Sequence, residues 1–226
     1  GDVYKRQVSF RGDVKSATKW FDELMAFLGW RFDADRAAGV LGDLGSHVIH
    51  IATLLAGEVA AVSANLQPYL DPQDDQTVPD NPANTSAALL MEYANGVHGT
   101  LHASAATNLG NRGQEQRVEI AGSQGSITGV MDMFNPDRIL LSRRGEDEVE
   151  ELGVPERLWG DVDRTAGKFD QTLEFYKKMS VGPRLFVDTV QQNGQSEPSF
   201  QDGLHVQKVI SAALASHASG SKVEVG

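Results

Sequence analysis

The alternation of polar and apolar residues marks a strand-rich middle to this chain. The runs Ser86–Tyr93 and Val97–Ser104 alternate with the period of half-buried strands, and Asn95-Gly96 between them is a strong signal for a hairpin turn. Similar short runs predict further strands at Val8–Arg11, Val59–Leu66, Gln116–Ala121, Ser126–Met131, Arg138–Arg143, Glu148–Leu152 and Lys222–Val225.

Apolar residues at helical spacing predict helices on both sides of these strands. The two clearest helices run from Asp43 to Gly57 and over Gln201–Ser216, the second ending before Gly220. Others are expected over Ser16–Phe27, Lys168–Lys178 and Leu185–Gln192, with a polar loop over Pro68–Pro82 and irregular structure over Glu156–Asp163. This order favours an α+β domain, a largely antiparallel sheet with helices packed on one face and the other face open. An open face is costly unless something covers it.

Composition narrows the class of protein. The 226 residues are 40% hydrophobic, enough for one large core. A net charge of −11 disfavours nucleic acids and anionic membranes as partners, since phosphate contacts need clusters of Lys and Arg. The chain has no cysteine and no apolar run long enough to cross a bilayer. We therefore expect a cytoplasmic protein with neither a nucleic-acid nor a membrane partner.

The helix that begins at Asp43 carries the candidate chemistry. Asp43, His47 and His50 follow at i, i+4 and i+7 and so share one face, whereas Val48 and Leu55 belong to an apolar face. A carboxylate and an imidazole one turn apart can hold a polar reactant and move a proton. Imidazoles have an ordinary pKa near neutral pH, which makes the histidine the candidate general base.

Simpler interpretations stand beside that one. Asp43 is also a good N-cap, and His47 can be a half-buried structural histidine. The three polar residues also have the types to ligate zinc, but no HExxH motif or further ligand cluster accompanies them, so we expect no metal. On the strand Val97–Ser104, His102 and Ser104 would line a substrate pocket if their polar face met a second domain, and would have no special role in solvent.

Three stretches resemble the Gfo/Idh/MocA family of sugar and inositol oxidoreductases. Trp30-Arg31 and Gly39–His47 resemble the family's glycine-rich turn followed by Asp-x-Gly-x-His at a helix start. Val118–Ile127 resembles its strand–turn–strand, and Pro198–Leu204 its closing helix.

Two positions depart from the family pattern. Ala37-Ala38-Gly39 replaces the usual triple glycine, which narrows the backbone freedom of the turn if positive φ is needed there. His50 stands where the family often has Asp, which puts the surroundings of His47 in doubt.

The resemblance implies a fold and a reaction. The fold is that of a glyceraldehyde-3-phosphate-dehydrogenase-like C-terminal domain, whose open sheet face would pack on a second subunit in a homo-oligomer. The activity is NAD(P)-dependent oxidation of a sugar, inositol or related polyol hydroxyl. His47 would be the proton acceptor and Asp43 the orienting carboxylate. Trp30, Arg31 and His102 are the candidates for substrate binding.

The dinucleotide-binding half of such an enzyme is not in this sequence. No strand followed by G-x-G-x-x-G precedes Asp43. We therefore expect NAD or NADP to be bound mainly by a missing Rossmann domain, and this chain to be inactive alone. Residues 1–7 are interpreted as a non-native leader and 8–226 as one domain for substrate binding and oligomerisation. Two alternatives stay open: an NAD-using glycoside-cleaving relative, and a stand-alone dimerisation or metal-binding module.

Overall fold

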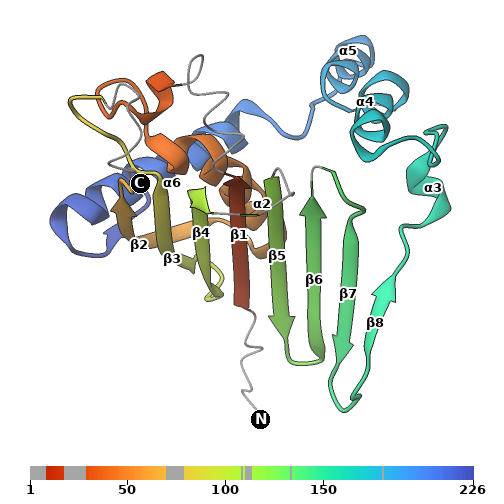
Figure 1. Ribbon diagram of the computed structural model, residues 1–226, viewed down its shortest axis with the longest axis horizontal. Helices are drawn as coiled ribbons and strands as arrows, with labels where there is room; N and C mark the ends of the chain where they lie inside the picture. The colour runs from red at the N-terminus through yellow and green to blue at the C-terminus, as the bar shows by residue number, and fades with distance from the viewer. Residues whose placement is uncertain are drawn as a thin grey trace.

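A single nine-stranded sheet organises the molecule (Figure 1). The computed structural model describes residues 9–17, 29–69, 79–107, 109, 114–132, 134–179 and 181–226. The strand order is β8-β7-β6-β5-β1-β4-β3-β2-β9. The strands are β1 (Ser9–Ala17), β2 (Val59–Gln67), β3 (Ser86–Tyr93), β4 (His98–Thr107), β5 (Gln114–Gly122), β6 (Gly125–Asp132), β7 (Arg138–Arg143), β8 (Val149–Leu152) and β9 (Val223–Glu224).

Strand β1 joins two antiparallel groups of strands. It pairs antiparallel with β5 and parallel with β4, and this is the one parallel pair among the described strands. A parallel pair needs a long crossover connection, which here contains a helix and two further strands. The prediction of an α+β fold with a largely antiparallel sheet is confirmed.

Helices cover one face of the sheet over only part of its width. The helix α2 (Ser46–Ala56) and the long α6 (Phe200–Ser219) lie behind β1 to β4 in Figure 1. The helices α3 (Glu156–Trp159), α4 (Lys168–Lys178) and α5 (Pro183–Gln191) lie instead beyond the end of β8, away from the packed layer (Figure 1). None of the described helices is both long and apolar enough to cross a membrane.

The core lies between β2 to β4 and the two long helices. Every second residue of these strands faces the helices, and Leu89, Met91 and Leu101 are almost fully buried. Val48 and Ile49 of α2 pack into the same cluster, as do Val209, Ile210 and Ala213 of α6. Burying each large aliphatic side chain is worth about 1.5–3 kcal/mol, so this cluster fixes α2 and α6 against the sheet.

The other face of the sheet is open and mostly polar. On β3 the residues that alternate with the core are exposed, among them Leu90 and Glu92. Leu90 pairs with Thr100 of β4, and Arg117 is exposed on β5. The open face therefore carries charges of both signs around a few apolar side chains.

The start of α6 is capped by its own side chains. The Ser199 hydroxyl accepts hydrogen bonds from the amides of Gln201 and Asp202, and the Asp202 carboxylate accepts one from the Ser199 amide at 2.6 Å. This capping box satisfies amides that a helix start leaves unpaired. Gly220 ends the helix in the left-handed conformation, as the sequence predicts.

Some predicted elements differ from the structure. Residues 16 and 17 of the helix expected over Ser16–Phe27 belong to β1, and the rest of that prediction lies outside the described residues. The leader predicted over 1–7 and most of the loop Pro68–Pro82 also lie outside them. Within the stretch expected to be irregular, Glu156–Trp159 forms the short helix α3.

Candidate functional site

The turn before α2 is fixed by one buried asparagine. Gly39 has φ of +63°, and a Cβ added there would lie 2.3 Å from the backbone oxygen of Asn84. The Asn84 side chain accepts from the Leu41 amide at 3.0 Å and donates to the Ala38 carbonyl at 2.8 Å. Its own carbonyl accepts from the Val40 amide at 2.8 Å. The loop before β3 thus holds the first helical residues in place.

Only the third residue of this turn needs a glycine. Among the described residues, Asn193 is the one non-glycine residue with positive φ, so Ala37 and Ala38 adopt ordinary backbone conformations. The replacement of the family's triple glycine by Ala37-Ala38-Gly39 therefore causes no backbone strain.

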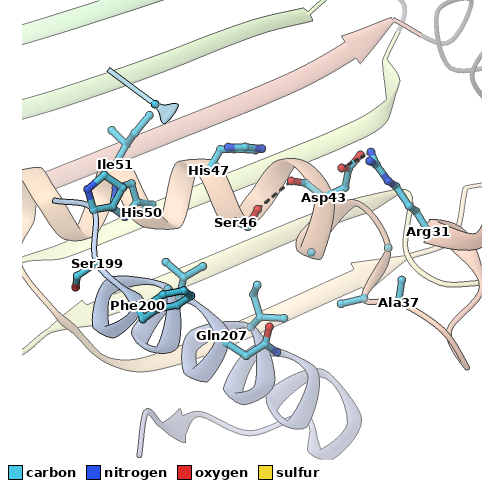
Figure 2. A pocket seen from close by; sticks show the side chains of 18 of the residues that line it. Arg31, Ala37, Asp43, Ser46, His47, His50, Ile51, Ser199, Phe200 and Gln207 are labelled. Atoms are coloured by element: carbon cyan, nitrogen blue, oxygen red, sulfur yellow. Dashed lines mark hydrogen bonds and ion pairs between the residues drawn. The ribbon is translucent and has the colours of Figure 1, made fainter. Parts of the chain in front are cut away.

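Asp43 lies inside a π-helical turn, not at a helix start. The turn η2 (Leu41–Gly45) precedes α2, and no side chain caps either segment. The prediction that the helix begins at Asp43, and the alternative that Asp43 is its N-cap, are therefore wrong. π-turns widen a helix locally and are frequent at functional sites. Figure 2 shows Asp43 and His47 on the same flank of the helical segment.

Asp43 forms an ion pair with Arg31, which belongs to the short 3₁₀ helix η1 (Gly29–Phe32). One Arg31 guanidinium nitrogen lies 2.6 Å from a carboxylate oxygen of Asp43 (Figure 2). The exposed fractions of the two side chains are 32% and 19%. The same guanidinium lies 5.6 Å from the centre of the Trp30 ring, within the range of a cation–π contact. These contacts hold the Asp43 carboxylate in one orientation.

The two histidines of α2 have different surroundings. His47 is exposed, and its ring makes no hydrogen bond with the described residues, unlike the ring of a satisfied structural histidine. His50 lies near the capping box of α6. Hydrogen bonds from Ser199, and to a lesser degree the positive charge of His50, hold the pKa of Asp202 below its usual value. No group of three metal-ligating side chains is present among the described residues, so the zinc hypothesis gains no support.

Asp43 and His47 line a large open groove of about 1380 Å³. Such a volume exceeds the roughly 300–1,000 Å³ typical of small-molecule pockets, which leaves room for more than a sugar. Four regions line the groove: the turn with α2, the start of β5, the region of α5, and the start of α6. Its polar lining includes Arg31, Arg36, Asp43, Ser46, His47, His50, Gln114, Gln116, Ser199 and Gln207.

The structure brings four of the five predicted site residues to this groove. Trp30, Arg31, Asp43 and His47 all line it. His102 does not, because it alternates along β4 with the buried Leu101 and Ala103 and so faces the open side of the sheet. There its ring lies 3.3 Å from the Ser86 hydroxyl.

Three residues of the groove region were not predicted from the sequence. Asn84 sits in a loop with no periodic pattern, so nothing local indicated its bonds to the turn. Gln116 lines the groove, and its side-chain amide nitrogen is buried and has no hydrogen-bond partner among the described residues. Arg36 stands among acidic residues of the turn, where an arginine looks like part of a solvated surface.

Comparison with known proteins identifies relatives along almost the whole chain. Residues 1–225 match the model of the oxidoreductase family described as its C-terminal alpha/beta domain. A levoglucosan dehydrogenase of Pseudarthrobacter phenanthrenivorans is 28% identical over 97% of this chain, and a D-apiose dehydrogenase of Rhizobium rhizogenes is 23% identical over 88%. The chain spans 60% and 52% of the length of these two curated relatives.

Solved structures share the fold. A levoglucosan dehydrogenase in complex with NADH and levoglucosan aligns with a TM-score of 0.74 at 26% identity, covering 99% of this chain and 59% of that one. An oxidoreductase from Agrobacterium radiobacter in complex with NAD+, L-tartaric acid and magnesium aligns with a TM-score of 0.67 at 20% identity. That alignment covers 98% of this chain and 57% of that one.

Proposed function

We propose, since this chain belongs to the Gfo/Idh/MocA oxidoreductase family through its C-terminal α/β domain, that it is the substrate side of an NAD(P)-dependent dehydrogenase of sugars or related polyols. The observation that carries the proposal is that an exposed imidazole, His47, and the carboxylate of Asp43, one helical turn away, both line the large groove. The relatives that act on levoglucosan and D-apiose support a sugar as the substrate class.

In this proposal the chain's own residues bind the alcohol and take its proton. His47 accepts the hydroxyl proton as the carbon–oxygen double bond forms. Asp43, held by Arg31, orients either the substrate or the His47 ring. Trp30 and Arg31 form the rim where the sugar enters. His102 has no part in the proposal because it faces the opposite side of the sheet.

The groove also suits a nicotinamide ring. The wall beside Asp43 is built from small residues, Ala37, Ala38, Gly39 and Gly42, against which a flat ring can lie. When bound, a nicotinamide cofactor would supply the acceptor for the hydride that leaves the substrate carbon. We infer that a second, dinucleotide-binding domain holds the rest of NAD or NADP, because the relatives are longer than this chain.

We further propose that the open face of the sheet is covered by a second copy of the protein. Leu90 of β3 is 62% exposed on that face, among polar and charged side chains. A face with both signs of charge can pair with its own copy through a two-fold axis.

The direct test is turnover by the full-length protein that contains this chain. With NAD+ or NADP+ and a panel of sugars, anhydrosugars and inositols, we expect net formation of NADH or NADPH with at least one of them. Cleavage of glycosides without net reduced cofactor would replace this proposal by the glycoside-cleaving alternative. No reaction with any substrate or cofactor would leave only a binding module.

A further inference from the structure

The charge of the groove is opposite to that of the chain as a whole. The chain carries a net charge of −11, but among the described residues the acidic and basic side chains that line the groove are Arg31, Arg36 and Asp43. Two guanidinium groups against one carboxylate leave these three side chains with a net positive charge. A concave site of one sign raises the local concentration of ligands of the other sign.

The surplus charge belongs to Arg36. Arg31 is already paired with Asp43 at 2.6 Å, so the pair is neutral as a unit. Within the described part of the chain, Arg36 makes no ion pair or side-chain hydrogen bond. The nearby Asp33 and Asp35 are engaged elsewhere, with the Asp35 amide and the Asn81 side chain respectively. Arg36 therefore presents an unpaired guanidinium to the groove.

A neutral sugar can accept hydrogen bonds from Arg36, but its hydroxyl groups carry no charge and cannot neutralise the guanidinium group. A ligand with an anionic group does both.

We propose that the substrate of this site is a hydroxylated acid, such as a sugar acid, and that Arg36 binds its carboxylate. This proposal rests on the proposed function, and it narrows the substrate from sugars in general to those that bear an anionic group. Arginine favours carboxylates because its planar fork donates two parallel hydrogen bonds.

The phosphates of the dinucleotide are the other source of anionic oxygens that Arg36 can meet. The two sources predict different kinetics. A contact to the substrate carboxylate affects acids and not their neutral counterparts. A contact to a cofactor phosphate affects every substrate equally and raises the KM for the dinucleotide.

The test compares matched substrates in the full-length enzyme. We expect kcat/KM for hexuronic or aldonic acids to exceed that for the matching neutral sugars by about tenfold or more. Arg36→Gln should reduce the acid-to-neutral ratio by about ten- to a hundredfold, the size of a lost charged hydrogen bond. Arg36→Lys should keep most of the ratio. Arg144→Gln, at the exposed β7–β8 turn, is the matched control and should leave the ratio as it is.

A binding measurement provides the second readout. Sodium salts of the same acids should raise the melting temperature of the wild-type protein and of the Arg144→Gln control more than that of Arg36→Gln. Oxidation of neutral sugars with no preference for acids would overturn this inference and leave the proposed function standing. A rise in the KM for the dinucleotide in Arg36→Gln, equal for acids and neutral sugars, would also overturn it. A failure to reduce cofactor with any substrate would count against the proposed function itself.

Discussion

At the scale of single residues, the ion pair between Arg31 and Asp43 joins two residues whose roles were predicted separately from the sequence. Spacing predicted Asp43 and His47 as a pair, and resemblance added Trp30 and Arg31 as candidates for the substrate. Nothing local indicated that Arg31 would contact Asp43, since the two are 12 residues apart in the sequence and belong to different helical turns. In the structure Arg31, a candidate for substrate binding, also orients the candidate catalytic carboxylate of Asp43.

We expect Asp43→Asn to lower kcat/KM of the full-length enzyme by about ten- to a hundredfold, because the amide loses the charged hydrogen bond to Arg31. The ion pair is partly exposed, so the melting temperature should change little; such pairs contribute about 0–1 kcal/mol to stability. Steady-state kinetics and a melting curve on the same sample separate these effects. A variant with wild-type kcat/KM would show that Asp43 has no role in the reaction.

At the scale of elements, strong periodic patterns predicted the structure well and special turns were missed. β3 and α4 have the predicted bounds because their patterns are regular and flanked by clear turn residues. The parallel pairing of β1 with β4 was not predicted, because it depends on contacts between distant segments rather than on local sequence. The π-turn was missed for a similar reason, since the bonds from Asn84 that fix it come from the loop before β3.

The turn before α2 depends on the glycine at position 39. Gly39→Ala should destabilise the protein by about 2–4 kcal/mol, because it combines a positive φ with a clash against the Asn84 backbone. Gly96→Ala is the matched control: its φ is also positive, but a Cβ there meets nothing within 4 Å, so only about 1 kcal/mol should be lost. Melting curves compare the two, and equal losses would mean that the close approach to Asn84 is unimportant.

At the scale of the whole molecule, the sheet has one covered and one open face. The order of the predicted elements, with helices on both sides of a run of strands, predicted this division. It did not predict that α3 to α5 would lie beyond β8 (Figure 1), because amphipathic helices do not reveal which surface they pack against. Because the open face is mostly polar, the proposed interface contains charges of both signs.

An interface of this kind should respond to both substitution and salt. We expect the full-length protein to sediment as a homo-oligomer, and Leu90→Glu to shift it towards smaller species. High salt should weaken the assembly as well, because it screens the charges of both signs on that face. Leu54→Glu, on the exposed side of α2, is the control and should leave the assembly intact. A monomeric wild-type protein at micromolar concentration would refute the proposed interface.

In the proposed mechanism, His47 takes the proton of the substrate in the groove beside α2. This is tested by measuring kcat/KM for the full-length His47→Ala variant with its best sugar substrate. The control is His98→Ala, on the open face of the sheet. General-base catalysis contributes about 10²–10⁴-fold, so a loss of that size is expected for His47→Ala and none for His98→Ala. Near-wild-type kcat/KM for His47→Ala would contradict the claim.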